Sequence, residues 1–199
     1  PCHLRTLSEM ADTVGYPGFP DMIAACLFQQ QNPGTELPEE YPQVTGRGYS
    51  YSSVTATFFA PSELCGTGGM YHQQIHPTPS WQNGPPHYDC AFAEKNPNLP
   101  QFQGLYVAQV ISLFSFHYHN VYYPCAFVRW FTPIGNEPCP NTGMWMVEAE
   151  YDDDGDYLVD VIYLDSILCQ AHLIPIYRED SIPIIFNIHI HFLLLIHYM

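Results

Sequence analysis

Basic side chains are scarce in this 199-residue sequence. Only five lysine and arginine residues oppose 20 acidic residues, which gives a formal net charge of −15. Proteins bind nucleic acids largely by neutralising phosphates with lysine and arginine, and anionic membranes attract proteins through the same side chains. Direct nucleic-acid binding and membrane association are therefore disfavoured. The expected partner is a protein or a basic peptide.

The sequence also lacks the patterns that mark secreted or disulfide-bonded proteins. It has no CxxC pair, no N-x-S/T sequon and no basic-then-apolar leader at its start. Its seven cysteines are an odd number and are widely spaced, which indicates free thiols in a reducing compartment. We therefore expect an intracellular protein, with the nucleus as a candidate location.

Catalytic motifs are missing as well. The sequence contains no G-x-S-x-G, no P-loop and no dinucleotide-binding glycine pattern. Asp165 and His172 lie seven residues apart, but no nucleophile is specified beside them. We accordingly expect no enzymatic activity and no cofactor.

Apolar and aromatic residues are abundant. They make up 47% and 15% of the chain, which is typical of a folded, strand-rich domain with one principal core. We predict an all-β or β-dominated α+β fold, built as a small barrel or a strongly curved antiparallel sheet with two short N-terminal helices. The predicted parts are a helical pair over 1–34, a linker over 35–47, a β-barrel-like body over 48–178 and an atypical apolar tail over 179–199.

Local signals place the predicted helices. Thr6 stands three residues before Glu9, which is the pattern of a capping box. Pro20 lies where the first turn of a second helix tolerates it, and Pro33 and Gly34 mark the end of that helix.

Alternating apolar residues predict the strands. One strand is expected over 49–60 and a hairpin over 105–131 that turns at His119–Asn120, with both faces covered. Strict alternation places Val107 and Leu113 of this hairpin on one face and Val110 on the other. A second hairpin is predicted over 144–164, because an Asp-Gly pair at 154–155 is a strong turn signal.

Three features are candidates for binding or metal coordination. Trp81 lies in a proline-rich loop, where it is predicted either to pack against the body or to present a recognition surface. His117 and His119 are expected on one face of a strand, as a zinc site would require, but no third ligand follows at a suitable spacing. The acidic run 151–157 resembles the start of a calcium loop yet lacks the expected glycine and final glutamate, so no metal is expected.

Several longer strings resemble the C-terminal region of proteins encoded by Plavaka-type (CACTA-related) DNA transposons of fungi. They are, in order, "ATFFAPSELCGTGGM", "TPSWQNGPPHYDCAF", "YPCAFVRWF", "NTGMWMVEAEYDDDGD" and "VIYLDSILCQAHLIPIY". The resemblance extends from about Leu4 to Tyr177. It implies an accessory domain, because the catalytic acids of such transposases lie upstream, and it assigns no functional residue within these strings.

The sequence departs from that family in two ways. Several positions that are arginine in the family are His, Gln or Cys here, which suggests a degraded copy. The segment 182–199 is strand-prone and uncharged, unlike the family's more polar continuation, and its deletion is expected to raise solubility.

The leading functional hypothesis is a non-catalytic accessory or protein-interaction domain of a transposon-encoded protein. The first alternative is a chromatin-reader-like β-barrel that binds a basic peptide. The second is a zinc-dependent enzyme that uses His117 and His119.

Overall fold

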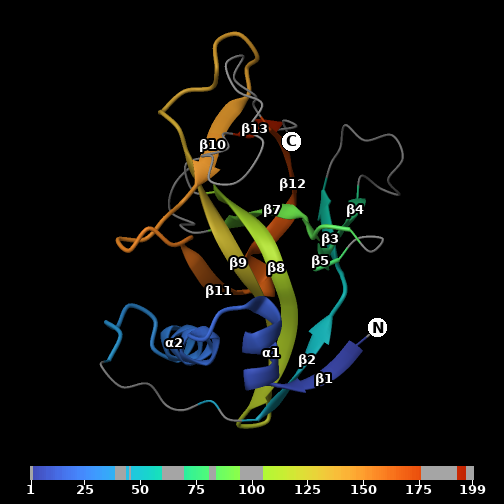
Figure 1. Cartoon of the computed structure of the whole chain (residues 1–199), viewed down its shortest axis with the longest axis vertical. Helices are drawn as coiled ribbons and strands as arrows, with labels where there is room; N and C mark the ends of the chain where they lie inside the picture. The colour runs from blue at the N-terminus through green and yellow to red at the C-terminus, as the bar shows by residue number, and fades with distance from the viewer. Residues whose placement is uncertain are drawn as a thin grey trace.

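The computed structural model describes residues 2–38, 44, 46–59, 70–80, 84–94, 105–175 and 192–195. Within these ranges the chain is strand-rich, with two short helices near its start, α1 (Leu7–Val14) and α2 (Phe19–Gln31) (Figure 1). This confirms the predicted β-dominated α+β class. The strands are β1 (Cys2–Thr6), β2 (Arg47–Tyr51), β3 (Val54–Phe59), β4 (Met70–Ile75), β5 (Pro77–Thr78), β6 (His87–Tyr88), β7 (Cys90–Glu94), β8 (Leu105–Tyr118), β9 (Val121–Pro133), β10 (Trp145–Ala149), β11 (Val159–Tyr163), β12 (Ile167–Pro175) and β13 (Phe192–Leu195), and the short 3-10 helix η3 (Leu164–Ser166) precedes β12.

The two helices begin and end where the sequence signals place them. The Thr6 hydroxyl accepts a hydrogen bond from the Glu9 N–H at 3.2 Å, and the Glu9 carboxylate accepts one from the Thr6 N–H at 2.7 Å, so the predicted capping box is confirmed. Pro20 lies in the first turn of α2, which ends at Gln31. Neither helix is long and apolar enough to cross a membrane, and the same holds for every helix in the described residues.

Nine strands form one antiparallel sheet in the order β1-β2-β8-β7-β12-β13-β10-β9-β11. Because β8 also pairs directly with β9, the sheet folds back on itself and is curved. β2 and β11 extend it from opposite edges of the β8–β9 hairpin, and the end strands β1 and β11 do not pair with each other. Of the two predicted forms, a small barrel or a strongly curved antiparallel sheet, the second describes the large sheet. Two small sheets, β3–β4 and β5–β6, accompany the large one.

Both faces of the β8–β9 hairpin are covered, as its two apolar faces predict. On one face, the Phe19 ring of α2 packs against Phe114 and Phe127, with ring centroids 5.0 and 5.3 Å apart. On the opposite face, Val128 and Trp130 belong to a second cluster of buried side chains. Since burial of such a side chain contributes roughly 1.5–3 kcal/mol, the hairpin is the centre of the core and holds the helices against the sheet.

A β-bulge in β8 overturns the predicted alternation along this strand. The register with β9 shifts between Val110 and Ser112. As a result Val110 and Leu113 pack in the same cluster, whereas Val107 packs in another one. Strict period-two alternation fails here because a bulge inserts one extra residue and reverses the faces that follow it.

The hairpin predicted over 144–164 is wrong as a pair of sheet strands. β10 and β11 pair one after the other with the same edge of β9 and not with each other. The Asp154–Gly155 turn does form, with Gly155 at a φ of +86°, but it closes a short loop with a single bridge between Tyr151 and Tyr157. β9 is long enough to supply backbone partners to both segments, and this pairing replaces the local one.

Candidate functional site

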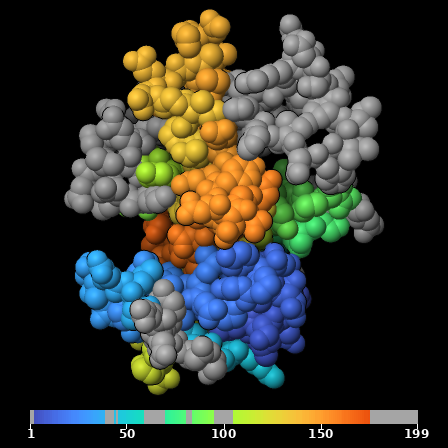
Figure 2. Space-filling model, turned by 60° about the vertical axis from the view of Figure 1, so that its left-hand side comes forward, coloured from blue at the N-terminus to red at the C-terminus, as the bar shows by residue number. Residues whose placement is uncertain are grey.

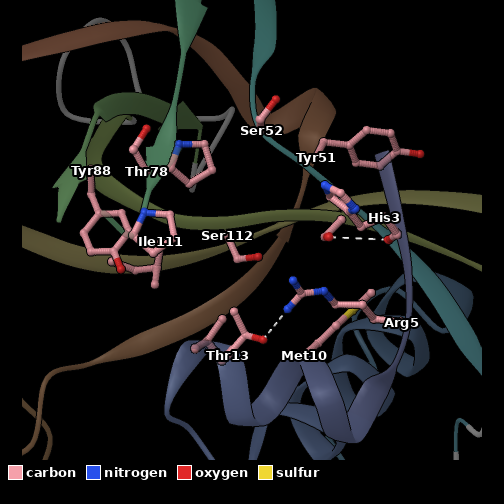
Figure 3. A pocket seen from close by; sticks show the side chains of 14 residues that line it. His3, Arg5, Met10, Thr13, Tyr51, Ser52, Thr78, Tyr88, Ile111 and Ser112 are labelled. Carbon is pink, nitrogen blue, oxygen red and sulfur yellow. Dashed lines mark hydrogen bonds between the residues drawn. The ribbon is translucent and has the colours of Figure 1, made fainter. Parts of the chain in front are cut away.

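A cleft lies beside α1, where β1, β2 and β8 meet the small β5–β6 sheet (Figure 3). Its volume is about 220 Å³, which is below the roughly 300–1,000 Å³ of typical small-molecule sites. The described residues that line it are His3, Arg5, Met10, Thr13, Val14, Ser50, Tyr51, Ser52, Pro77, Thr78, Pro79, Tyr88, Ile111 and Ser112. They combine hydroxyl groups, apolar groups and one guanidinium, so the cleft suits a small group that has both polar and apolar parts.

The cleft exists because two strands leave β8 at different points. β2 pairs with the part of β8 from Leu113 to Phe116, and β7 pairs with the part from Leu105 to Gln109. The bulge lies between these parts, so on the edge of β8 that faces away from β9, Ile111 and Ser112 border the cleft. Where β2 ends, the chain turns away to begin β3, and the single strand predicted over 49–60 is therefore two strands in separate sheets.

Asp89 holds the β5–β6 wall of the cleft in place. Its Oδ2 accepts a hydrogen bond from the His76 N–H at 2.8 Å, and its Oδ1 lies 3.2 Å from Nε2 of His87. Its own N–H donates to the His76 carbonyl at 3.1 Å, and its carbonyl accepts from the Val110 N–H at 2.9 Å. The Asp89 side chain is only 11% exposed. Through these bonds one residue fastens the wall to the bulge of β8.

Arg5 reaches into the cleft from β1 (Figure 3). Its Nη1 donates a hydrogen bond to the Thr13 hydroxyl at 2.6 Å, and that hydroxyl donates to the Glu9 carbonyl at 2.7 Å. α1 therefore fixes the position of the guanidinium. Arg5 makes no ion pair with any described residue. Because a guanidinium has five N–H donors, Arg5 retains donors for a bound group.

The lining of the cleft is cationic although the protein is acidic. None of its described lining residues is Asp or Glu, in a chain that has 20 of them. Glu9 lies on α1, and its carboxylate is turned to the start of the helix. The hydrogen bond from the Thr6 backbone is the main reason that the pKa of Glu9 is below its ordinary value, and the Thr6 hydroxyl and the positive charges of Arg47 and Arg5 lower it further. The nearest charge to an anionic group inside the cleft, among the described lining residues, is therefore the positive charge of Arg5.

The hydrogen bond that joins a serine and the histidine of the described lining involves the main chain of the histidine. The Ser50 hydroxyl donates to the main-chain carbonyl of His3 at 3.4 Å and makes no hydrogen bond to the ring. Across the described ranges, no group of three His, Cys, Asp or Glu side chains is arranged to hold a metal ion. What the cleft offers is a set of binding contacts.

A second cleft of about 280 Å³ lies between β3 and the segment from η3 into β12. Its described lining has a single charged side chain, Asp165, and otherwise apolar and threonine residues. Because it holds no cation, it is a weaker candidate for recognition of a charged partner.

The residues singled out from the sequence lie elsewhere. His117 is exposed at the end of β8, with its ring 5.4 Å from that of Tyr122. His119 lies in the turn with a φ of +48°, and its ring stacks on Tyr118 at 4.1 Å. The prediction that the two histidines share one strand face is wrong, because the chain reverses before the second. Trp81 lies outside the described residues.

The loop between β10 and β11 packs against another arginine, Arg129 of β9. The Arg129 guanidinium lies 3.8 Å from the ring centroid of Tyr157, which in turn stacks on Tyr151 at 5.0 Å. Asp152 accepts two backbone N–H bonds within the same turn, at 3.1 and 2.9 Å, so a structural role accounts for this part of the acidic run. In the space-filling view the orange residues of this part of the chain lie directly above the blue helices (Figure 2).

Sequence reasoning missed the cleft residues because they come from distant segments. Arg5, Thr13, Ser50, Thr78 and Ser112 belong to five different elements of the described chain. The only local signal was the position of Arg5 directly before the capping residue of α1, which places this side chain next to the helix.

Comparisons with protein-family models, with curated proteins and with solved structures found no match to this chain.

Proposed function

We propose that this chain is a non-catalytic protein-interaction domain of a transposon-encoded protein, and that the cleft beside α1 receives one side chain of its partner. The observation that supports this most strongly is the size of the cleft. About 220 Å³ is small for a cofactor or a drug-sized ligand, but it accommodates a single side chain. The resemblance to Plavaka-type proteins supplies the biological setting, in which an accessory domain contacts other proteins.

The lining also favours a protein partner. A central pocket that mixes apolar walls with a few polar groups is how protein interfaces bind an anchoring side chain. Met10, Val14 and Ile111 provide apolar surface, and Thr78 and Ser112 provide hydroxyl groups that can donate or accept. Because these residues lie on paired strands and on a capped helix, the cleft is formed before a partner arrives, which lowers the entropic cost of binding.

Selection from a random-peptide phage library against the immobilised full chain tests this proposal. We expect enriched peptides that lose binding at least tenfold to Ser112→Trp, which fills the cleft, and keep binding to Ser8→Trp, which adds the same side chain at an exposed position of α1 outside the cleft. Circular dichroism checks that both variants are folded, and Ser50→Trp replaces Ser112→Trp if the latter is not. Peptides that bind all variants equally, or no enrichment, would reject the proposal.

A basic-peptide reader is the second candidate, and the stacked pair Tyr151–Tyr157 beside the acidic turn favours it. Such rings bind cations through their faces. The guanidinium of Arg129 in the same chain already lies over the face of the Tyr157 ring, so an incoming cation would have to displace it. Binding of lysine-rich or methyl-lysine peptides on an array, reduced by Tyr157→Leu, would support this alternative, and an array without signal above background would remove it.

A further inference from the structure

We infer that the side chain received by the cleft is acidic, and that Arg5 binds its carboxylate. This inference rests on the proposed interaction function and names the chemistry of the partner. The partner segment would present an aspartate or glutamate to the cleft beside α1, with the rest of the segment lying over the surface between α1 and β5–β6.

The first argument is the placement of the guanidinium. Arg5 is half-buried, and its contact with Thr13 at 2.6 Å holds it at the cleft, while Thr13 itself is held by the Glu9 carbonyl. A guanidinium whose position is fixed in advance loses less entropy when it binds a carboxylate, and its planar array of donors matches the two carboxylate oxygens. The Ser112 hydroxyl lies in the same lining and can donate to the same group.

The second argument is local charge. At physiological ionic strength charges separated by more than about 8 Å are largely screened, so a group inside the cleft responds mainly to the residues that line it. The one formal charge among these described lining residues at neutral pH is that of Arg5, and none of them is acidic. The distant negative charges that make up the net charge of −15 act only weakly through this screening, but their remaining repulsion disfavours a phosphorylated partner, whose phosphate carries about −1.5 to −2 charges, more than a singly charged carboxylate.

The third argument is the shape of the apolar wall. Met10 and Val14 of α1 and Ile111 of β8 line the same cleft as the guanidinium. The methylene groups of an acidic side chain can pack on these residues while its carboxylate meets Arg5. An inorganic anion would leave this apolar surface without a partner.

Nuclear magnetic resonance titration of the ¹⁵N-labelled full chain tests the inference with two small probes, N-acetyl-L-glutamate N-methylamide and its glutamine counterpart. We expect saturable shifts of the Arg5, Thr13 and Ser112 amides by the glutamate probe, with a Kd on the order of 10 mM. The neutral glutamine probe should bind about tenfold more weakly, because it lacks the charge that Arg5 recognises.

Two variants assign the preference to Arg5. Arg5→Gln should abolish the difference between the probes, whereas Arg47→Gln, which removes an exposed arginine on the neighbouring strand outside the cleft lining, should leave it unchanged. Equal shifts with both probes, no saturable shift, or a preference that survives Arg5→Gln would overturn the inference. The phage selection remains a separate test. If the selected peptides carry a neutral anchoring side chain and do not bind the Ser112→Trp variant, the acidic anchor is refuted, while the proposed interaction function stands.

Discussion

At the residue scale, hydrogen bonds that a side chain makes with nearby backbone determine how several titratable groups behave. Glu9 and Cys139 are both solvent-accessible, and the pKa of each is lowered by hydrogen bonds from neighbouring residues. Cys90 shows the opposite case, because burial raises its pKa to about 12. Such differences change both the pH dependence of stability and the reactivity of the thiols.

We expect Glu9→Ala to destabilise the protein at neutral pH and to have a smaller effect in acid. The pKa of Glu9 is lower in the folded protein than its ordinary value of 4.5. Its ionised form therefore adds stability at pH values above 4.5, and this contribution is lost as the pH falls through the folded value. Urea unfolding at a series of pH values measures the effect. Ser8→Ala, at an exposed position of the same helix, serves as the control, and a Glu9→Ala effect independent of pH would contradict this account.

We expect Cys139 to react fastest with iodoacetamide among the cysteines whose side chains are described. Its thiolate accepts hydrogen bonds from the Thr142 hydroxyl and from the Asn141 and Thr142 N–H groups, which lower its pKa and increase the thiolate fraction at neutral pH. Cys90 and Cys125 are buried, and their raised pKa values keep them protonated. Mass spectrometry of the native protein over time gives the order of labelling. Early labelling of Cys90 would contradict the described core.

At the element scale, the β-bulge of β8 and the wall fastened to it create the cleft. The bulge separates the part of β8 that pairs with β2 from the part that pairs with β7. Asp89 then connects the β5–β6 wall to the same point through its main chain and its carboxylate. The cleft thus forms only where β8, β5 and β6 come together, and none of these strands forms it alone.

We expect Asp89→Ala to loosen this wall and to cost about 1–3 kcal/mol of unfolding free energy, because the His76 N–H loses its carboxylate acceptor. Urea denaturation measures the cost, and amide hydrogen exchange at His76 and Thr78 should accelerate. Asp153→Ala, in an exposed turn, is the matched control and should change stability by less than about 0.5 kcal/mol. Equal effects of the two variants would show that Asp89 does not support the wall.

At the scale of the whole molecule, local signals in the sequence predicted the elements, and long-range pairing decided the architecture. The capping box at Thr6 and the turn at His119–Asn120 involve neighbouring residues only, so both were predictable. β1 was missed, because its partner β2 begins at Arg47, far along the chain. The acidic turn at Asp154–Gly155 was predicted correctly, but nothing local reveals that β9 competes for the strands on each side of it.

The candidate site was less predictable than the fold. Its residues meet only after β1 pairs with β2 and after the bulge sets the register of β8. A sequence pattern can indicate that Arg5 precedes a helix, but it cannot show that Ser112 lies in the same cleft. The histidine pair His117 and His119 was conspicuous in the sequence. The turn separates the two rings, however, so that His117 lies against Tyr122 and His119 lies against Tyr118.

The tail gives a further prediction at this scale. β13 lies between β12 and β10, pairing with both. Deletion of residues 182–199 removes these pairings, and we expect it to lower the unfolding free energy by about 1–3 kcal/mol, in contrast to the gain in solubility that the sequence suggests. Urea denaturation of the truncated and full chains measures this loss of stability: a truncated chain of unchanged stability would show that β13 does not complete the sheet.

The most direct test of the central claim, that Arg5 binds an acidic side chain of the partner, is the affinity of a peptide from the phage selection for three versions of the full chain, measured by isothermal titration calorimetry. We expect Arg5→Gln to weaken binding about tenfold or more relative to the wild-type chain, since the charge-assisted contact of a half-buried guanidinium is lost, and Arg47→Gln to stay close to wild type. Equal affinities for Arg5→Gln and the wild-type chain would contradict the account.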